Sequence, residues 1–282
     1  MQRYRLPEAL VEQAREFSAG TRAPAEPRNA ATVVLLRPGV EQPEVYLLRR
    51  RTSMAFAGGM AVFPGGGVDP RDDDASIAWA GPSPAEWATR LDTDEAGARA
   101  LVCAAVRETF EESGVLLAGP SATSIVDDTS GDDWERDRLA LESHELSLTE
   151  FLRRRGLVLR TDLLRPWAAW LTPIFEPKRY RTWFFAAELP AGQVTRDVST
   201  ESSEVMWLGV DEALRRADAG EMLMLPPTWM TCLDVERCGS TEAVMAEQRS
   251  VSMFMPEPVK DGDEFVLSTP PFYADLLAGR LT

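Results

Sequence analysis

Histidine and cysteine are scarce in this chain of 282 residues. The single histidine is His144, and the three cysteines are Cys103, Cys232 and Cys238, none in a C-x-x-C spacing. An odd number of cysteines without that spacing argues against a disulfide framework and against a zinc site. We therefore expect reduced, buried thiols.

Long apolar runs and an excess of positive charge are also absent. No stretch approaches the roughly 20 apolar residues that span a bilayer, and residues 1–17 contain no signal-peptide core. The formal net charge of −15 argues against a general binder of nucleic acids or membrane surfaces, because both are anionic. We expect a cytoplasmic protein that binds neither.

The composition is that of a folded globular protein, with 44% apolar and 27% charged residues. A chain of this length can form one large domain or two small ones. No internal repeat is present, so the simplest account is a single α/β domain over residues 1–282. Its core spans about 30–235, with insertions at about 69–93 and 120–160 and a C-terminal extension at about 236–282.

Hydrophobic periodicity and turn residues predict the elements of that domain. Helices are expected at 7–17, 94–114, 127–143, 146–157, 211–220 and 226–237, and strands at 31–38, 44–50, 166–175, 179–189 and 203–210. The first two strands, separated by PGVEQP, suggest a hairpin. Residues 53–70 are expected to form a strand followed by an open loop of glycines.

Three glutamates are crowded into RETFEESGV, residues 107–115. On a helix, Glu108, Glu111 and Glu112 share one face, opposite apolar side chains. A solvated amphipathic face would explain this pattern. However, the acids occupy the last turns, where the helix dipole disfavours negative charge, and no lysines are interleaved with them. Three carboxylates on one face also suit a hard divalent cation, and the residues alone leave both interpretations open.

RETFEESGV resembles the core of the Nudix box, R-E-aliphatic-x-E-E-x-G-aliphatic, with Thr109 in the aliphatic position. Upstream, FPGGGVD at 63–69 resembles the glycine-rich segment that precedes the box, and WLTPIFEPKRYRTWFFAAEL with SEVMWLGVDEAL resembles the second half of the fold. The resemblance covers most of residues 30–235. It implies the Nudix fold, an α/β (α+β) sandwich with a mixed sheet between helices.

Within this superfamily, VYLLRRRTSMAFAGGMAVFPGGGVD and EESGVLL are most similar to the acyl-CoA/CoA diphosphatase branch related to the mammalian peroxisomal enzyme. Two departures stand out. The full box begins G-x₅-E-x₇-R, which places a glutamate at residue 99, where this chain has Arg99; Glu95 is the nearest replacement. The arginine and histidine of the bacterial CoA diphosphatase signature are replaced by Ala55 and Ala57. The residues therefore support the superfamily better than they support CoA specificity.

The resemblance implies hydrolysis of a diphosphate in CoA, acyl-CoA or a related nucleoside diphosphate derivative. Mg²⁺ or Mn²⁺ ions held by Glu108, Glu111 and Glu112 would bridge the phosphates and activate water. Glu108 and Glu112 lie one turn apart and are the expected direct ligands. Arg107 is expected to orient a box glutamate through a charge-assisted hydrogen bond.

Further residues are candidates for substrate or metal contacts. Either Glu201 or Glu204, with Glu204 in the predicted set, would add a carboxylate to the metal site. Arginine suits phosphate because its planar guanidinium donates bidentately, and glycine lets the backbone approach closely. The predicted substrate-binding residues are Gly65, Gly66, Arg50, Arg51 and Arg179. His144 is not expected to be catalytic.

Two alternatives remain beside acyl-CoA hydrolysis. One is a Nudix hydrolase of another diphosphate substrate, such as a nucleotide sugar or a dinucleotide. The other is a non-catalytic Nudix domain that binds nucleotides as a sensor; such domains typically lose box glutamates, whereas this chain keeps all three. A homodimer is compatible with the sequence but has no support in it.

Overall fold

The computed structural model describes residues 8–18, 20, 23–54, 57–261, 264–271 and 273. The helices are α1 Glu8–Ser18, α2 Pro84–Leu91, α3 Glu95–Ser113, α4 Asp132–Glu142, α5 Leu148–Arg155, α6 Val210–Asp218, α7 Pro226–Cys238 and α8 Thr241–Ala246, with 3₁₀ turns η1 Pro70–Asp73 and η2 Thr161–Leu163. The strands are β1 Arg28–Arg37, β2 Glu44–Arg50, β3 Ala61–Val62, β4 Gly65–Gly67, β5 Trp79–Ala80, β6 Ala118–Gly119, β7 Val158–Arg160, β8 Arg165–Leu171, β9 Tyr180–Glu188, β10 Ser202–Gly209, β11 Pro258–Asp261 and β12 Glu264–Leu267.

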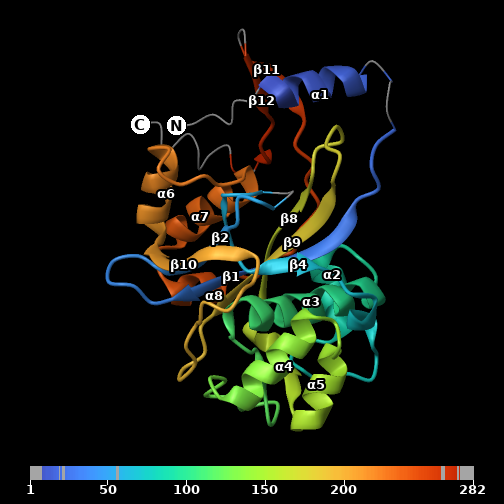
Figure 1. Cartoon of the computed structure of the whole chain (residues 1–282), viewed down its shortest axis with the longest axis vertical. Helices are drawn as coiled ribbons and strands as arrows, with labels where there is room; N and C mark the ends of the chain where they lie inside the picture. Colours follow the sequence, from blue (N-terminus) through green and yellow to red (C-terminus); the bar gives the residue numbers. More distant parts are fainter. Residues whose placement is uncertain are drawn as a thin grey trace.

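A mixed sheet forms the centre of the molecule (Figure 1). Its strand order is β10-β2-β1-β9-β8, with β3 paired to β2 and β4 paired to β1. Strands β1 and β9 run parallel, and the other pairs are antiparallel. The predicted antiparallel pairing of the first two strands is confirmed by the register of Leu36 opposite Val45.

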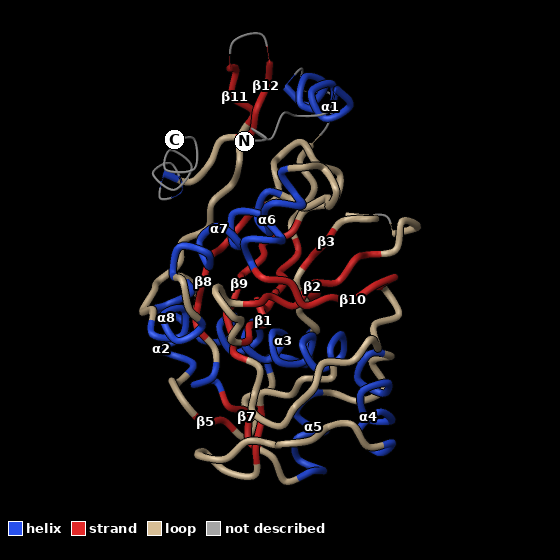
Figure 2. The backbone as a smooth tube through the Cα atoms, turned by 90° about the vertical axis from the view of Figure 1, so that its left-hand side faces the viewer, coloured by secondary structure: helices blue, strands red, loops and turns tan. Residues whose placement is uncertain are grey.

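Helices cover both faces of this sheet, which makes the sandwich that the sequence predicts. Successive side chains of a strand point to opposite faces; accordingly Val33 and Leu35 of β1 join the core with α3, whereas Val34 and Leu36 join the core with α6 and α7. Figure 2 shows α3, α4 and α5 on one side of the sheet and α6 and α7 on the other.

The long helix α3 begins and ends where the sequence predicts. The Asp94 side chain caps its first turn by accepting the backbone N–H of Gly97, and Gly114 ends it at a positive φ of 75°. Glycine adopts this left-handed backbone without a Cβ clash. The helix packs against β1, β4 and η1, so its last turns face the glycine segment.

The expectation of an open glycine loop at the end of 53–70 is wrong. Gly65, Gly66 and Gly67 form β4, which pairs antiparallel with β1 opposite Thr32, Ala31 and Ala30. A Cβ on Gly65 would lie 2.5 Å from the carbonyl oxygen of Ala31. The missing side chains therefore let this strand lie close to β1, in addition to making the backbone permissive.

The two insertions meet in a small second sheet. Strand β5 from the first insertion pairs with β7, which also pairs with β6. Trp87 of α2 is fully buried and its ring lies 5.8 Å from the ring of Phe185 in β9. The first insertion is thus anchored in the main core. No helix in the described residues is long and apolar enough to cross a membrane.

Replacing Trp87 with alanine should lower the free energy of unfolding by about 3–5 kcal/mol, because a large aromatic side chain leaves a cavity in a closed core. Urea unfolding followed by circular dichroism measures this change. Replacing Leu223, which is 58% exposed, with alanine is the control and should cost less than about 0.5 kcal/mol. Equal, small effects of both substitutions would mean that the insertion is not part of the cooperative core.

Candidate active site

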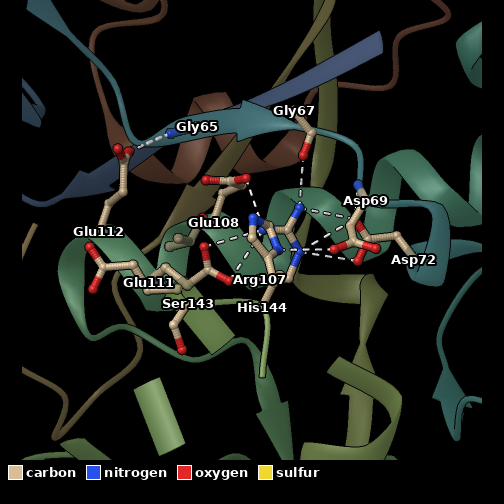
Figure 3. A network of polar contacts seen from close by, with 12 residues as sticks. Gly65, Gly67, Asp69, Asp72, Arg107, Glu108, Glu111, Glu112, Ser143 and His144 are labelled. Carbon is tan, nitrogen blue, oxygen red and sulfur yellow. Dashed lines mark hydrogen bonds and ion pairs between the residues drawn. The ribbon is translucent and has the colours of Figure 1, made fainter. Parts of the chain in front are cut away.

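The candidate site is built around one buried guanidinium at the end of α3. The side chain of Arg107 is only 3% exposed. Its Nη1 donates to Glu108 at 2.9 Å and to both oxygens of Glu111 at 3.2 Å. Its Nε and Nη2 donate to the carboxylate of Asp72 in η1. Figure 3 shows these three acids arranged around Arg107, as expected of a residue that orients box glutamates.

The same guanidinium ties the helix to the glycine strand. Nη2 of Arg107 donates to the carbonyl oxygen of Gly67 at 2.8 Å. At the other end of the strand, the N–H of Gly65 donates to Oε2 of Glu112 at 2.7 Å (Figure 3). A Cβ on Gly66 would lie 2.6 Å from the carboxyl group of Glu108. Because β4 consists of glycines, it leaves space for the carboxyl groups of the box glutamates.

Burial and crowding change the proton affinities of these acids. Burial raises the pKa of Glu108 to about 7 and the pKa of Glu111 to about 7, although Arg107 opposes both shifts. Burial, followed by repulsion from Glu108, raises the pKa of Glu112 well above its usual range. When they are ionised, these carboxylates therefore carry more negative charge than the one central arginine neutralises.

The chemistry of these donors fits a divalent cation. Carboxylate oxygens are preferred ligands of Mg²⁺ and Mn²⁺, and a dication would stabilise the ionised form of these carboxylates, which burial and mutual repulsion disfavour. In the described residues, no three His, Cys, Asp or Glu side chains are gathered closely enough to enclose an ion. Mg²⁺ is commonly bound by one or two carboxylates, with water molecules and substrate phosphates as its other ligands, so Glu108 and Glu112 could suffice as its protein ligands.

Positive charge does reach the end of α3, but from distant segments. Arg138 of α4 is 2% exposed and donates to the carbonyl oxygen of Glu111 at 2.7 Å. The backbone N–H of Arg196 donates to the carbonyl oxygen of Ser113 at 2.9 Å, and its guanidinium pairs with Glu135, which Arg138 also binds. These arginines stabilise the negative end of the helix dipole, which explains how α3 ends without basic residues of its own.

Sequence reasoning missed Asp72, the third acid on Arg107. The box motif G-x₅-E-x₇-R locates its first acid in two ways. Counting six residues forward from Gly66 leads to Asp72, whereas counting eight residues back from Arg107 leads to Arg99. The insertion lies between these two anchors, so only the forward count finds the acid that Arg107 binds. Glu95, suggested as the replacement, is exposed at the first residue of α3, and Arg99 pairs with Asp73 at 3.0 Å.

Arg50, one of the predicted phosphate-binding arginines, lies near enough to the box for its charge to act on Glu112. It donates to the carboxylate of Glu201 at 2.7 Å, and the charges of both side chains act on Glu112. Arg51 is exposed and donates to the carbonyl oxygen of Ser202. Glu204, 53% exposed, pairs with Arg49 instead. The structure therefore brings Glu201, rather than Glu204, toward the box.

Arg179 and His144 have partners other than the three box glutamates. The buried guanidinium of Arg179 donates to the carbonyl oxygens of Ala25 and Thr172, an arrangement that favours a structural role over phosphate binding. His144, in the connection between α4 and α5, has a left-handed φ of 59° and its Nδ1 lies 3.0 Å from Asp69. Ala55 lies outside the described residues.

Comparisons with known proteins agree with this arrangement. Residues 89–235, more than half of the chain, match the NUDT19 Nudix domain. A nudix hydrolase 7 of Caenorhabditis elegans is 28% identical over 200 residues, and the acyl-coenzyme A diphosphatase NUDT19 of Xenopus laevis is 24% identical over 229 residues. The matches cover 71% and 65% of this chain, and the chain spans 57% of the length of each relative.

A solved structure is similar as well. The crystal structure of a NUDIX hydrolase from Alicyclobacillus acidocaldarius has a TM-score of 0.67 and 26% sequence identity, covering 80% of this chain and 98% of that one. This similarity confirms the predicted fold. The chain belongs to the NUDT19 Nudix domain family.

Replacing Arg107 with methionine should lower the free energy of unfolding by about 3–5 kcal/mol, because it leaves buried carboxylates without their counter-charge. Thermal and urea unfolding of the metal-free protein measure this cost. Arg99, on the same helix, pairs with the half-exposed Asp73, so Arg99→Met is the matched control and should cost less than about 1 kcal/mol. Similar costs for both variants would contradict the central role of Arg107.

Proposed function

We propose that this chain hydrolyses the diphosphate bond of acyl-CoA, CoA or a related nucleoside diphosphate derivative, with Mg²⁺ or Mn²⁺ as the required ion. The observation that carries the proposal is the set of box carboxylates gathered by Arg107 against a strand without side chains. Membership of the NUDT19 Nudix domain family supports the reaction class, and the Xenopus relative named as an acyl-coenzyme A diphosphatase supports the substrate class.

Glu108, Glu111 and Glu112 are the residues that would hold the ion, with Glu108 and Glu112 as the direct ligands. When bound, a divalent cation neutralises diphosphate charge and lowers the pKa of coordinated water. The remaining contribution comes from the protein: Arg107 fixes Glu108 and Glu111, and the N–H of Gly65 orients Glu112. Preorganised groups of this kind need no rearrangement during the reaction.

Recognition of the substrate is assigned to the rim of the site. Arg50 places a guanidinium beside the box, where its planar group suits a phosphate of the substrate. A cytoplasmic location and a homodimer remain predictions.

A panel of diphosphate substrates tests the proposal. The purified protein is incubated with Mg²⁺ or Mn²⁺ and acyl-CoA, CoA, a nucleotide sugar or a dinucleotide, and the products are read by mass spectrometry. Acyl-CoA cleavage should release adenosine 3′,5′-bisphosphate and an acylated phosphopantetheine. Turnover of only the other substrates would shift the assignment to another Nudix hydrolase, and no turnover of any would favour a nucleotide sensor.

Replacing Glu112 with glutamine should reduce kcat by at least about 100-fold while leaving the fold intact, because the amide lacks the charge that binds a cation. Steady-state kinetics and circular dichroism provide the two readouts. Glu145→Gln, on the exposed connection after α4, is the control. A Glu112→Gln enzyme with the wild-type kcat would remove Glu112 from the metal site.

Replacing Gly66 with alanine should also reduce kcat strongly, because the new methyl group would collide with the carboxyl group of Glu108. The neighbouring Gly67→Ala is a sharp control, since its Cβ meets nothing within 4 Å. Alanine is compatible with a β-strand at both positions, so the two variants differ in whether the new methyl group meets Glu108. Equal activities of the two variants would contradict the close packing of this carboxylate against β4.

A further inference from the structure

Three charged residues lie on one face of α4, at the spacing that brings helical side chains together. Glu135, Arg138 and Glu142 are separated by three and four residues. The buried guanidinium of Arg138 donates to Glu135 and to Glu142, at 2.7 and 3.0 Å, as well as to the carbonyl oxygen of Glu111. This face of the insertion is therefore fixed directly to the last turn of the box helix.

Glu142 has a second partner far along the chain. Its Oε1 accepts from the hydroxyl of Thr200 at 2.6 Å and from the backbone N–H of Thr200 at 3.4 Å, while its Oε2 accepts from Arg138. Thr200 is exposed and belongs to the segment between β9 and β10. The carboxylate thus connects a buried arginine to an exposed loop.

Immediately after Thr200 the loop reaches the box. The carbonyl oxygen of Glu201 accepts the N–H of Arg51 at 2.9 Å, and its carboxylate pairs with Arg50 at 2.7 Å. The Glu201 side chain is 51% exposed, and exposed ion pairs of this kind have little stability of their own. Backbone pairing of Ser202 with Arg50 holds the strands β10 and β2 together, and the contact of Thr200 with Glu142 holds the segment just before them. The charges of both Arg50 and Glu201 act on Glu112.

We propose that Glu142 is a positioning residue that, through Thr200, holds the Arg50–Glu201 pair beside the box carboxylate Glu112. The inference rests on the proposed diphosphatase function and extends it, because it gives the helical insertion a role in catalysis. Hydrogen bonds to an ionised carboxylate are stronger than bonds between neutral groups. Arg138 binds both the end of α3 and the carboxylate of Glu142, and it therefore fixes the position of Glu142 relative to the box helix.

A purely structural link between α4 and the loop is the competing explanation. It predicts that breaking the link changes stability or loop mobility without changing the rate of an otherwise folded enzyme. The positioning role predicts a lower kcat with unchanged thermal stability, because Thr200 is exposed and contributes nothing to the core.

The matched variants are Thr200→Val, which keeps the shape of the side chain and removes the hydroxyl, and Thr200→Ser, which keeps the hydroxyl. Thr200→Val should lower kcat about ten-fold, whereas Thr200→Ser should stay near the wild-type rate. Glu142→Leu, which removes both carboxylate oxygens, should also lower kcat, and adding Thr200→Val to it should lower kcat no further, because both changes break the same contact.

Hydrogen exchange at the Arg51 amide supplies a readout that needs no activity, because this amide donates to Glu201. Its protection should fall about ten-fold in Thr200→Val and remain in Thr200→Ser. Unchanged protection in Thr200→Val would overturn the link, and reduced protection with a wild-type kcat would overturn the positioning role. Absence of turnover in the wild-type protein would instead overturn the proposed function, and hydrogen exchange would still decide whether Glu142 places the loop.

Discussion

The sharing of one buried guanidinium among three carboxylates is the interaction on which this site depends. Burial alone would lower the pKa of Arg107, but the charges of Glu108, Asp72 and Glu111 outweigh that effect and raise it. Arg107 therefore stays charged, while burial and, to a smaller degree, mutual repulsion disfavour the ionised form of the acids around it. This imbalance leaves the site prepared for further positive charge, which a divalent cation supplies.

The surrounding fold provides space and hydrogen bonds for the crowded carboxylates. Strand β4 has no side chains to compete for the space beside Glu108, and its backbone gives Glu112 a hydrogen bond. Arg138 from one insertion stabilises the carbonyl end of α3, and η1 from the other supplies Asp72. Both insertions thus support the box helix in addition to enlarging the domain.

Local signals in the sequence were sufficient for the box helix and the acids on it. Asp94 and Gly114 are cap residues whose effects act within a turn, so the bounds of α3 could be predicted from neighbouring residues. The role of Asp72 could not be found by spacing from Arg107, because an insertion separates them. The contact of Glu142 with Thr200 joins residues 58 apart in the chain and leaves no periodic signal. The strand β4 was also missed, because its pairing depends on space beside β1 rather than on its own propensity.

The most direct test is a crystal structure of the protein soaked with Mn²⁺, recorded with anomalous scattering. The account predicts a strong anomalous peak bounded by the carboxylates of Glu108 and Glu112, with Arg107 still bound to Asp72. A well-ordered box helix with no anomalous peak at these carboxylates would contradict it.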